Sequence, residues 1–282
     1  MQFSLYALPV VLLLLFALEQ AFPLRHPKRP LLQRLAVNGC VAALALATAL
    51  VLVKPVSSKL VEHAEEFGLL SIVAMPQIAQ GIFGFLLLDL SFYYWHRANH
   101  ASRFLWRFHN AHHVDPDLDV STAFRFHFVE IGLSAGFRAV QIFLIGGPPW
   151  VFVAYELVFQ LNTLFQHSNL RLPIAAERWL SLVLVTPRMH GIHHSQVREE
   201  NNSNWSSVFS WWDRLHGTLC LSIPQSQVDI GIAGYSLPGD NQVKSVLLMP
   251  FRKQRDYWRH PSGVNVSRLS ASEEARRSHL AQ

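Results

Sequence analysis

Residues 78–100 read IAQGIFGFLLLDLSFYYWHRANH, an apolar run that ends in two histidines with the spacing HxxxH. The apolar part is long enough to cross a bilayer about 30 Å thick as a helix. His96 and His100 stand four residues apart at one end of the run, and helical geometry places such pairs on one face. This stretch therefore predicts a membrane-spanning helix whose end presents two imidazoles, able to bind one metal ion or to face two neighbouring ones.

The composition indicates a membrane protein. Of 282 residues, 50% are hydrophobic and 15% are charged, compared with about 25% charged in typical soluble domains. The net charge of +5 comes from Lys and Arg residues at the ends of apolar runs and near the C-terminus, without a basic face interleaved with aromatics. Such charges are typical of membrane orientation and headgroup contact, so no nucleic-acid partner is expected. Cys40 and Cys220 have no CxxC neighbour, which argues against a thiolate metal site.

Four further apolar runs predict additional spans, at 3–22, 36–53, 129–146 and 150–166. The first is expected to be an anchor and not a cleaved signal peptide, because no positive charge precedes it and no convincing cleavage site follows it. Gly146-Gly147-Pro148-Pro149 predicts a tight turn between the last two runs. Pro76 divides the long run 67–95 into a short interfacial piece and the span from about residue 78.

The polar segments between these runs predict the topology. The basic segment 25–34 should be cytoplasmic, and the mixed-charge segment 54–66 should be a loop on the opposite side. The spans that the apolar runs and the loop charges predict return every histidine group to the cytoplasmic face. Residues 175–186 are expected to form an interfacial helix, and the tail from Arg252 is expected to be loosely ordered.

Nine of the 15 histidines fall in four tight groups: HxxxH at 96–100, HxxHH at 109–113, His167 alone, and HxxHH at 190–194. Positions i, i+3 and i+4 share one helical face, so the rings within each group converge. A lone histidine is usually only hydrogen-bonded, but burying nine imidazoles without partners would be costly. Metal coordination is the simplest common explanation. Nine ligands exceed the about four of a tetrahedral zinc ion and suit two ions.

Imidazole ligands alone do not choose the metal, because they suit zinc, copper, iron and nickel. Open coordination positions and redox chemistry would favour iron. The residues by themselves therefore predict a paired metal site and leave the identity of the ions open.

Six sequence blocks between Asp89 and Thr218 resemble, in order and spacing, the fatty acid hydroxylase/sterol desaturase superfamily. The blocks are DLSFYYWHRANH, FHNAHH, STAFRFHFVE, FQHSN, TPRMHGIHHS and NWSSVFSWWDRLHGT. The resemblance implies an all-α, polytopic helical membrane protein with a cytoplasmic helical cap that carries the histidine-box metal site. It also implies an oxidoreductase, a monooxygenase that uses two iron ions and O2 to hydroxylate an unactivated C–H bond of a lipid, either a fatty acyl chain or a sterol-like molecule.

Carried over to this sequence, the resemblance implies nine metal ligands: His96, His100, His109, His112, His113, His167, His190, His193 and His194. His127 and Asn162 are candidates for a tenth ligand, and His127 is alternatively expected to hold Glu130 and the start of its helix. Arg97, Arg125 and Asp213 are expected either to orient imidazoles through hydrogen bonds or to contact headgroups and cap helices.

Two positions depart from the family pattern. Phe128 stands where the family usually has proline, which leaves the geometry on the substrate side less constrained. His216 stands where the block WDRLFGT has an aromatic residue, and this histidine is expected to pack and not to bind metal.

The resemblance also sets expectations for organisation and partners. Three regions are expected: membrane anchor helices at 1–77, a catalytic domain at 78–222, and a polar, basic C-terminal tail at 223–282. The sequence contains no cytochrome b5-like segment, so a separate electron donor of cytochrome b5 or ferredoxin type is expected. The lipid substrate should enter from the bilayer, and a bacterial inner membrane is the expected location of this multi-pass protein.

Three alternatives stay open. A desaturase would use the same site. A histidine-rich metal transporter would place carboxylates near the middle of the bilayer; Asp89 and Glu156 fall within the expected spans, but the histidines gather at one end. A haem carrier needs only one or two axial histidines and leaves the HxxHH groups unexplained, and the HExxH motif of metalloproteases is absent.

Overall fold

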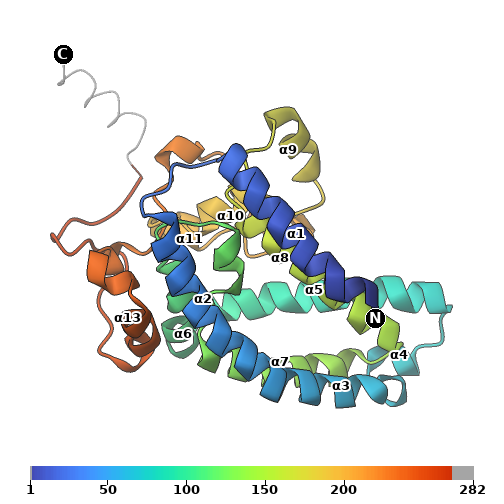
Figure 1. Cartoon of the computed structure of the whole chain (residues 1–282). Coiled ribbons are helices and arrows are strands. Elements are labelled where there is room, and N and C mark those ends of the chain that lie inside the picture. The colour runs from blue at the N-terminus through green and yellow to red at the C-terminus, as the bar shows by residue number, and fades with distance from the viewer. Residues whose placement is uncertain (1, 269–282) are drawn as a thin grey trace.

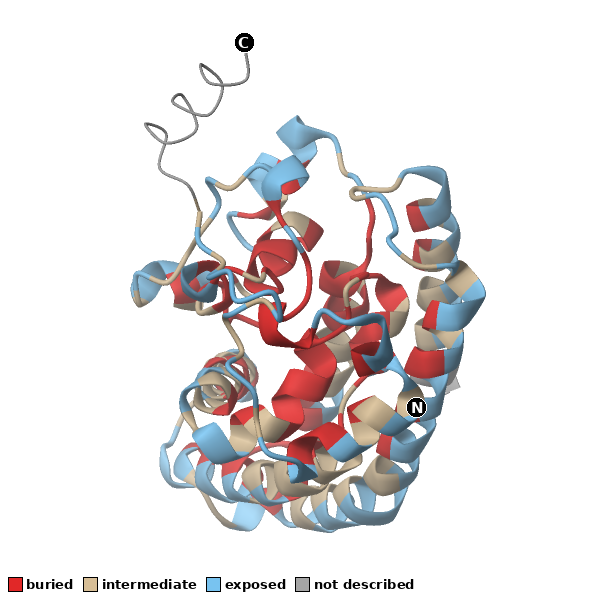
Figure 2. Ribbon diagram, turned by 90° about the vertical axis from the view of Figure 1, so that its left-hand side faces the viewer, coloured by how far each residue is buried: buried red, intermediate tan, exposed pale blue. Residues whose placement is uncertain are grey.

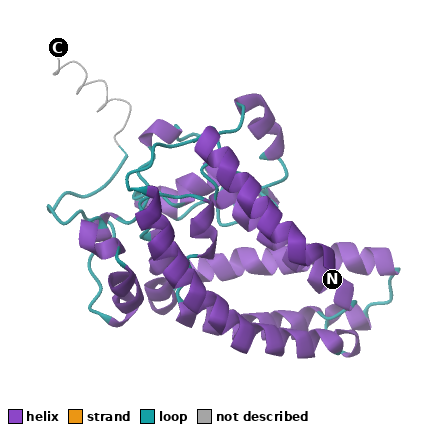
Figure 3. Ribbon diagram, viewed as in Figure 1, coloured by secondary structure: helices purple, strands orange, loops and turns teal. Residues whose placement is uncertain are grey.

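A computed structural model describes residues 2–268, with side chains from residue 7 onward. The described residues form helices and loops with four isolated β-bridges and no β-strand (Figure 3). The predicted all-α fold is therefore confirmed for this part of the chain.

The long helices are α1 (Gln2–Ala21), α2 (Leu31–Thr48), α3 (Lys54–Glu62), α5 (Gln77–Ala101), α7 (Phe128–Ile145) and α8 (Pro149–His167). A π-helical turn, η1 (Ala49–Val53), joins α2 to α3, so these elements form one continuous helix of 32 residues. Among the described residues, three helices are long and apolar enough to cross a membrane: Leu31–Glu62, Gln77–Ala101 and Phe128–Ile145. The side chains of α1 are described only from Ala7 onward, and α8 is not among the three, so the crossings at 3–22 and 150–166 stay predictions.

The prediction that residues 54–66 form a loop was wrong. Lys54–Glu62 are helical and pack against α7, with Leu60 and Val61 lying on the apolar cluster around Leu88. Proline inside a helix clashes with the carbonyl four residues earlier. The π-helical turn ends at Val53, two residues before Pro55, and includes the carbonyl of Val51 with which the proline ring would clash.

Short helices form the remainder: α4 (Leu69–Ile72), α6 (Arg103–His113), α9 (Ile174–Leu180), α10 (Pro187–His193), α11 (Arg198–Asn201), α12 (Trp211–Leu215) and α13 (Val243–Leu248). Single turns of 3-10 helix are η2 (Ala64–Glu66), η3 (Val120–Phe124), η4 (Gln225–Gln227), η5 (Ala233–Tyr235), η6 (Pro238–Asn241) and η7 (Met249–Phe251). Helices α6, α10, α11 and α13 gather at one end of the long helices (Figure 1). Buried residues concentrate toward the middle of the molecule, whereas exposed ones line the outer long helices (Figure 2).

The turn between α7 and α8 confirms the prediction from Gly-Gly-Pro-Pro. Helix α7 ends at Ile145 and α8 begins at Pro149. Gly146 has φ +63°, and a Cβ atom there would lie 1.8 Å from the carbonyl oxygen of Phe67. Only glycine satisfies both the backbone angle and this close approach. The division of the 67–95 run into α4 and α5 also follows the prediction. The helix expected over 175–186 is present only as α9, Ile174–Leu180, and residues 181–186 form turns and extended chain.

The C-terminal region packs onto the helices that carry the first histidine boxes. Val246 and Met249 share an apolar cluster with Val41 of α2 and Trp106 of α6. Beyond residue 252, Arg255 pairs with Asp240 and Arg268 pairs with Glu200. The end of the expected loose tail, 269–282, lies outside the described residues.

Asp89 ties α5 to the segment before α12. Its buried carboxylate accepts hydrogen bonds from the backbone N–H groups of Val208 and Phe209, from Trp212 Nε1 and from Tyr155 Oη. Removing the carboxylate would leave buried donors without a partner, and such donors cost more than an average hydrogen bond contributes.

We therefore expect Asp89→Ala to lower the free energy of unfolding by about 3 kcal/mol or more, measured from the unfolding midpoint in detergent. Asp229→Ala is the control, because Asp229 forms an exposed ion pair with Lys28 and its loss should cost less than about 0.5 kcal/mol. Equal effects of the two substitutions would contradict this role for Asp89.

Candidate metal centre

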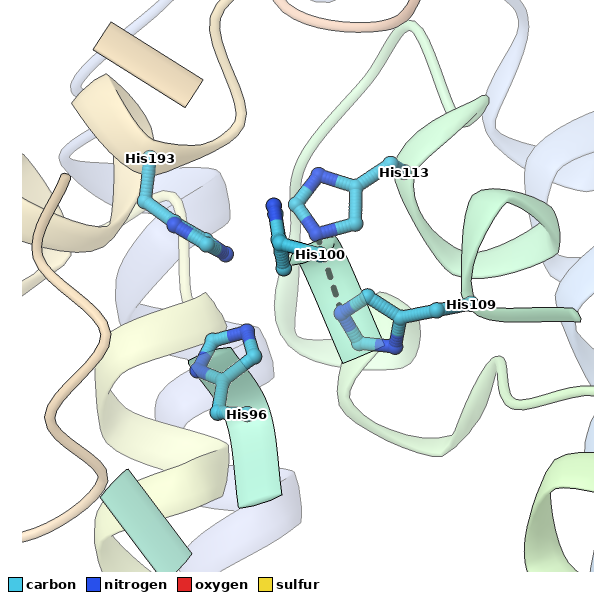
Figure 4. A group of neighbouring side chains, drawn as sticks. All are labelled: His96, His100, His109, His113 and His193. Atoms are coloured by element: carbon cyan, nitrogen blue, oxygen red, sulfur yellow. Dashed lines mark hydrogen bonds between the residues drawn. The ribbon is translucent and has the colours of Figure 1, made fainter. Parts of the chain in front are cut away.

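Five histidines from three helices meet beside the end of α5 (Figure 4). They are His96 and His100 of α5, His109 and His113 of α6, and His193 of α10. One ligand nitrogen from each lies within 4.8 Å of all the others. Ser102 adopts an extended backbone between α5 and α6, and its side chain caps α6 by accepting a hydrogen bond from the N–H of Leu105. This break turns the chain so that the second box faces the first.

Four further histidines form a second group: His112, His167, His190 and His194. The Nε2 atom of His167 lies 3.1 Å from that of His112 and 2.9 Å from that of His190. His194 Nε2 lies 3.1 Å from His190 Nε2. Each HxxHH box therefore contributes to both groups, and all nine predicted ligands are brought together in a five-histidine group and a four-histidine group.

The facing nitrogens are the observation that tests whether a metal fits. A neutral imidazole carries one N–H, and His167 Nδ1 lies 2.7 Å from the carbonyl oxygen of Thr163, which can only accept. The proton of His167 is therefore on Nδ1, and its Nε2 presents a lone pair to two other nitrogens. In the five-histidine group, the buried Nε2 atoms of His100 and His193 have no hydrogen-bond partner among the described residues. A cation between these atoms satisfies them, so both groups fit metal ions.

Outer hydrogen bonds fix the orientation of four rings. The Nδ1 atoms of His96 and His193 lie 2.9 Å and 2.8 Å from the carbonyl oxygens of Trp205 and Ser203, as His167 does with Thr163. His109 Nδ1 lies 2.8 Å from Glu130 Oε1. Metal-binding histidines typically donate from the outer nitrogen in this way, which fixes the tautomer and the ring plane. His113 Nδ1 lies instead 3.3 Å from Asn201 Nδ2, an amide nitrogen that donates.

Burial keeps the histidines neutral. Loss of hydration lowers the pKa well below its ordinary value, and neighbouring imidazoles lower it further, at His112, His113, His190 and His194. Burial lowers the pKa of His193 to about 3. Neutral imidazole is the form that binds metal, so these histidines are in the binding form at neutral pH.

The structure does not bring His127 into either group. Its Nδ1 accepts a hydrogen bond from the N–H of Val129 at the start of α7, and its Nε2 donates to the carbonyl oxygen of Leu247. The prediction that His127 holds the helix start agrees with this position, but Glu130 pairs with His109 instead. Asn162 donates from Nδ2 to the carbonyl oxygen of Ser207 at 2.7 Å and so supports the segment that follows Trp205.

Arg97 and Asp213 both act on Trp205, whose carbonyl holds His96. The Arg97 guanidinium lies 5.3 Å from the centre of a Trp205 ring. Asp213 accepts hydrogen bonds from the N–H groups of Trp205 and Ser206, and burial raises its pKa.

Arg125 contacts the backbone of the second histidine box, and His216 packs on α5. Arg125 is fully buried; its Nε donates to the carbonyl oxygen of Ala111, between the histidines of the second box, and its Nη1 donates to Asn38. His216 stacks on Tyr93 at 4.6 Å and lies outside both groups, as predicted.

Several residues of the site carried little or no signal in the sequence. The carbonyls of Thr163, Ser203 and Trp205 hold histidines, yet every residue has a carbonyl, so no sequence pattern could select them. Asn201 and Phe126 were also missed; the Phe126 ring stacks on His112 with centroids 4.4 Å apart. Their places depend on the packing of segments distant in the sequence.

The chain is similar to known proteins over the region that carries these groups. Residues 81–218 match the family model described as fatty acid hydroxylase. An ornithine lipid hydroxylase of Rhizobium tropici is 33% identical over 159 residues, which are 56% of this chain and 47% of the relative. The alkylglycerol monooxygenase of Xenopus tropicalis is 32% identical over 137 residues, 48% of this chain and 29% of the relative. Human cholesterol 25-hydroxylase is 28% identical over 151 residues, which are 51% of this chain and 52% of the relative.

The chain belongs to the fatty acid hydroxylase/sterol desaturase superfamily. The predicted resemblance is thereby confirmed, and the matched region 81–218 contains all nine histidines. The similarity spans about half or less of the length of these relatives. No solved structure matches the chain significantly.

The low pKa values predict how acid acts on the metal-free protein. A histidine whose pKa is lower in the folded state than its ordinary value of about 6.5 binds fewer protons folded than unfolded. The contribution of these histidines to the free energy of unfolding is therefore fully present above about pH 6.5 and is lost progressively as the pH falls below it. We expect the unfolding midpoint of the metal-free protein to decrease as the pH is lowered from 7.5 to about 5. The decrease should be smaller in His190→Asn, which lacks one of these histidines. A midpoint independent of pH, or equal slopes for both proteins, would contradict this account.

Proposed function

We propose that the protein is a membrane monooxygenase that holds two iron ions and hydroxylates an unactivated C–H bond of a lipid. The observation that supports this most strongly is the division of nine histidines, seven of them buried, into two groups with converging nitrogens. Membership of a superfamily whose members here include hydroxylases and monooxygenases favours redox chemistry. Zinc would fit imidazole ligands equally well, but it supplies no redox chemistry.

Each group would hold one ion. The five-histidine group would bind the first through His96, His100, His109, His113 and His193, and the four-histidine group would bind the second through His112, His167, His190 and His194. Bound iron would supply the activation of O2. The residues of the chain would orient the imidazoles through the carbonyls of Trp205, Ser203 and Thr163 and the carboxylate of Glu130. Burial of all four histidines of the second group would limit the access of bulk water to it.

The substrate is proposed to be a lipid that reaches the site from the bilayer. Three helices are apolar enough to cross a membrane, and their outer faces carry exposed apolar side chains such as Leu50, Ile82 and Phe143. The relatives' names refer to an ornithine lipid, an alkylglycerol and cholesterol, which share long alkyl or ring hydrocarbon. We infer that this chain oxidises a hydrocarbon carbon of such a membrane lipid.

The reaction that we propose converts R–H, O2, two electrons and two protons into R–OH and water. Because neither the lipid nor the amino-acid side chains supply two electrons, an external donor of cytochrome b5 or ferredoxin type is part of the proposal. We further propose a multi-pass arrangement with the histidine groups on the cytoplasmic side, in a bacterial inner membrane. Desaturation by the same site is the alternative outcome, and it would give an alkene in place of the alcohol.

Metal transport is less well supported, because the two carboxylates Asp89 and Glu156 in the long helices α5 and α8 are engaged. Asp89 accepts hydrogen bonds from the segment 208–212, as described above. Glu156 Oε2 lies 2.6 Å from Arg138 Nη1, and its Oε1 accepts from Gln160 at 2.8 Å. Neither group is free to bind a passing ion near the middle of the span.

The first prediction concerns iron. Protein purified from iron-supplemented cells should contain close to two irons per chain, measured by elemental analysis. His100→Ala and His112→Ala each remove a nitrogen from one group and should each lose at least about half of the iron, because an ion that loses a ligand binds far more weakly.

His216→Phe is the matched control, because this histidine packs on Tyr93 outside both groups and should keep the full iron content. Lipid extracts of cells that express the wild-type protein should gain a species with one added oxygen atom, and His112→Ala should abolish it. One metal or none in the wild-type protein, or full iron in both alanine variants, would contradict the proposal.

The second prediction concerns Glu130, which is buried and whose partner is His109. Glu130→Gln keeps the shape but removes the charge that orients the imidazole, so we expect iron affinity to fall by about 10- to 100-fold, measured by competition with a chelator. Glu199→Gln, on an exposed side chain of α11, should leave affinity unchanged. Equal affinities for the wild-type and Glu130→Gln proteins would show that Glu130 does not orient His109.

A further inference from the structure

A cavity of about 730 Å³ lies where α5 ends and α6 begins. Its walls come from the last turn of α5, from the first turns of α6, from Arg198 and Asn202 at α11, and from residues 254–258. His100 of the five-histidine group forms part of its lining. The cavity therefore connects the surface formed by the short helices to a proposed metal ligand.

The lining of this cavity is basic. Arg103, Arg107 and Arg198 all line it, and no acidic side chain does. Within residues 2–268, none of these three arginines forms an ion pair. A lining that carries only positive charges attracts a negatively charged partner and increases its rate of encounter. Phe104, which is 56% exposed, adds apolar contact surface beside them.

Aromatic rings lead from the cavity to the five-histidine group. Trp258 and Trp106 both line the cavity, and their rings are stacked with centroids 6.1 Å apart. The Trp106 ring lies 4.7 Å from that of His100 and 5.3 Å from that of His113. Trp106 is buried, so this contact is protected from solvent. Trp258, Trp106 and the two histidines therefore form a continuous series of ring contacts, with neighbouring centroids no more than 6.1 Å apart.

We propose that this cavity is the docking and electron-entry site for an acidic one-electron carrier protein, with Trp258 and Trp106 on the path to His100 and His113. The inference rests on the proposed monooxygenase function. Two molecules of reduced carrier each deliver one electron, and each carrier is thereby oxidised. With O2, two protons and the lipid R–H, these two electrons give R–OH and water, so atoms and charge balance.

The position of the cavity favours a protein over a lipid headgroup. Apart from the last residues of α5, its lining belongs to short helices and loops beyond the three apolar helices (Figure 1). A lipid would have to leave the bilayer to fill it, whereas a carrier protein in water reaches it directly. Complexes for electron transfer bury little surface and depend on charge for fast encounter, and the three arginines satisfy that requirement.

The first test measures docking with the full-length, iron-loaded protein in detergent. The probes are an acidic [2Fe–2S] ferredoxin and the soluble domain of a cytochrome b5, bound to the immobilised protein at low salt. Arg107→Glu should weaken binding of the carrier by about tenfold or more, because a like charge replaces an attractive one. Arg171→Glu makes the same change on an exposed arginine that does not line the cavity, and it should leave binding within about twofold of wild type.

The second test measures whether electrons from the carrier pass through Trp258. In stopped-flow reduction by the carrier, Trp258→Leu should slow reduction of the iron at saturating carrier concentration, while reduction by dithionite stays at the wild-type rate. Trp179→Leu is the control, because Trp179 is 75% exposed on α9 and does not line the cavity. Equal rates for Trp258→Leu and wild type would contradict the tryptophan path.

Three results would overturn the docking proposal. The first is that neither carrier binds to the wild-type protein, and the second is that Arg107→Glu binds the carriers as tightly as wild type. The third is that Arg107→Glu loses carrier binding only when the protein is in vesicles that contain phosphatidylglycerol. The last result would assign the cavity to an anionic headgroup. Failure of the proposed function is a separate outcome, because a protein without iron, or one that dithionite cannot reduce, is detected before any carrier is added.

Discussion

The structure depends on placing nine imidazoles together in two groups, with seven of the nine buried. Their Nε2 atoms face one another at about 3 Å in the four-histidine group, where lone pairs repel unless a cation lies between them. The chain meets this constraint from outside the groups: carbonyls of Thr163, Ser203 and Trp205 and the carboxylate of Glu130 hold the outer nitrogens. The inner nitrogens are thereby directed inward before any metal binds.

The rest of the fold holds these outer partners in place. Asp89 and Asp213 anchor the segment 205–209, from which Trp205 reaches His96. Arg125 fixes the carbonyl of Ala111 within the second histidine box, and the C-terminal residues Val246 and Met249 pack against the same region. Buried charged groups of this kind are costly to leave unpaired, so each has several partners. The long helices then carry the assembled site at one end, where the proposed lipid substrate and the proposed carrier protein would approach from different directions.

Much of this arrangement could be predicted from the sequence, and the failures have physical reasons. Residues 96–100 and 109–113 show helical spacing, so the convergence of their rings follows from helix geometry alone. The prediction of a loop at 54–66 was wrong because mixed charge is typical of loops, whereas Leu60 and Val61 pack on an apolar cluster that includes Ile142 of α7, a contact that only the tertiary structure provides. The split of each HxxHH box between two groups, the pairing of Glu130 with His109 and the three carbonyl partners depend on how distant segments pack, which local spacing does not encode.

The central claim is that each histidine group holds one ion. The most direct measurement is a crystal structure of the iron-loaded protein with anomalous diffraction collected at the iron absorption edge. This account predicts two separate peaks, one among the Nε2 atoms of His96, His100, His109, His113 and His193 and one among those of His112, His167, His190 and His194. A single peak, or peaks outside these two groups in iron-replete protein, would contradict it.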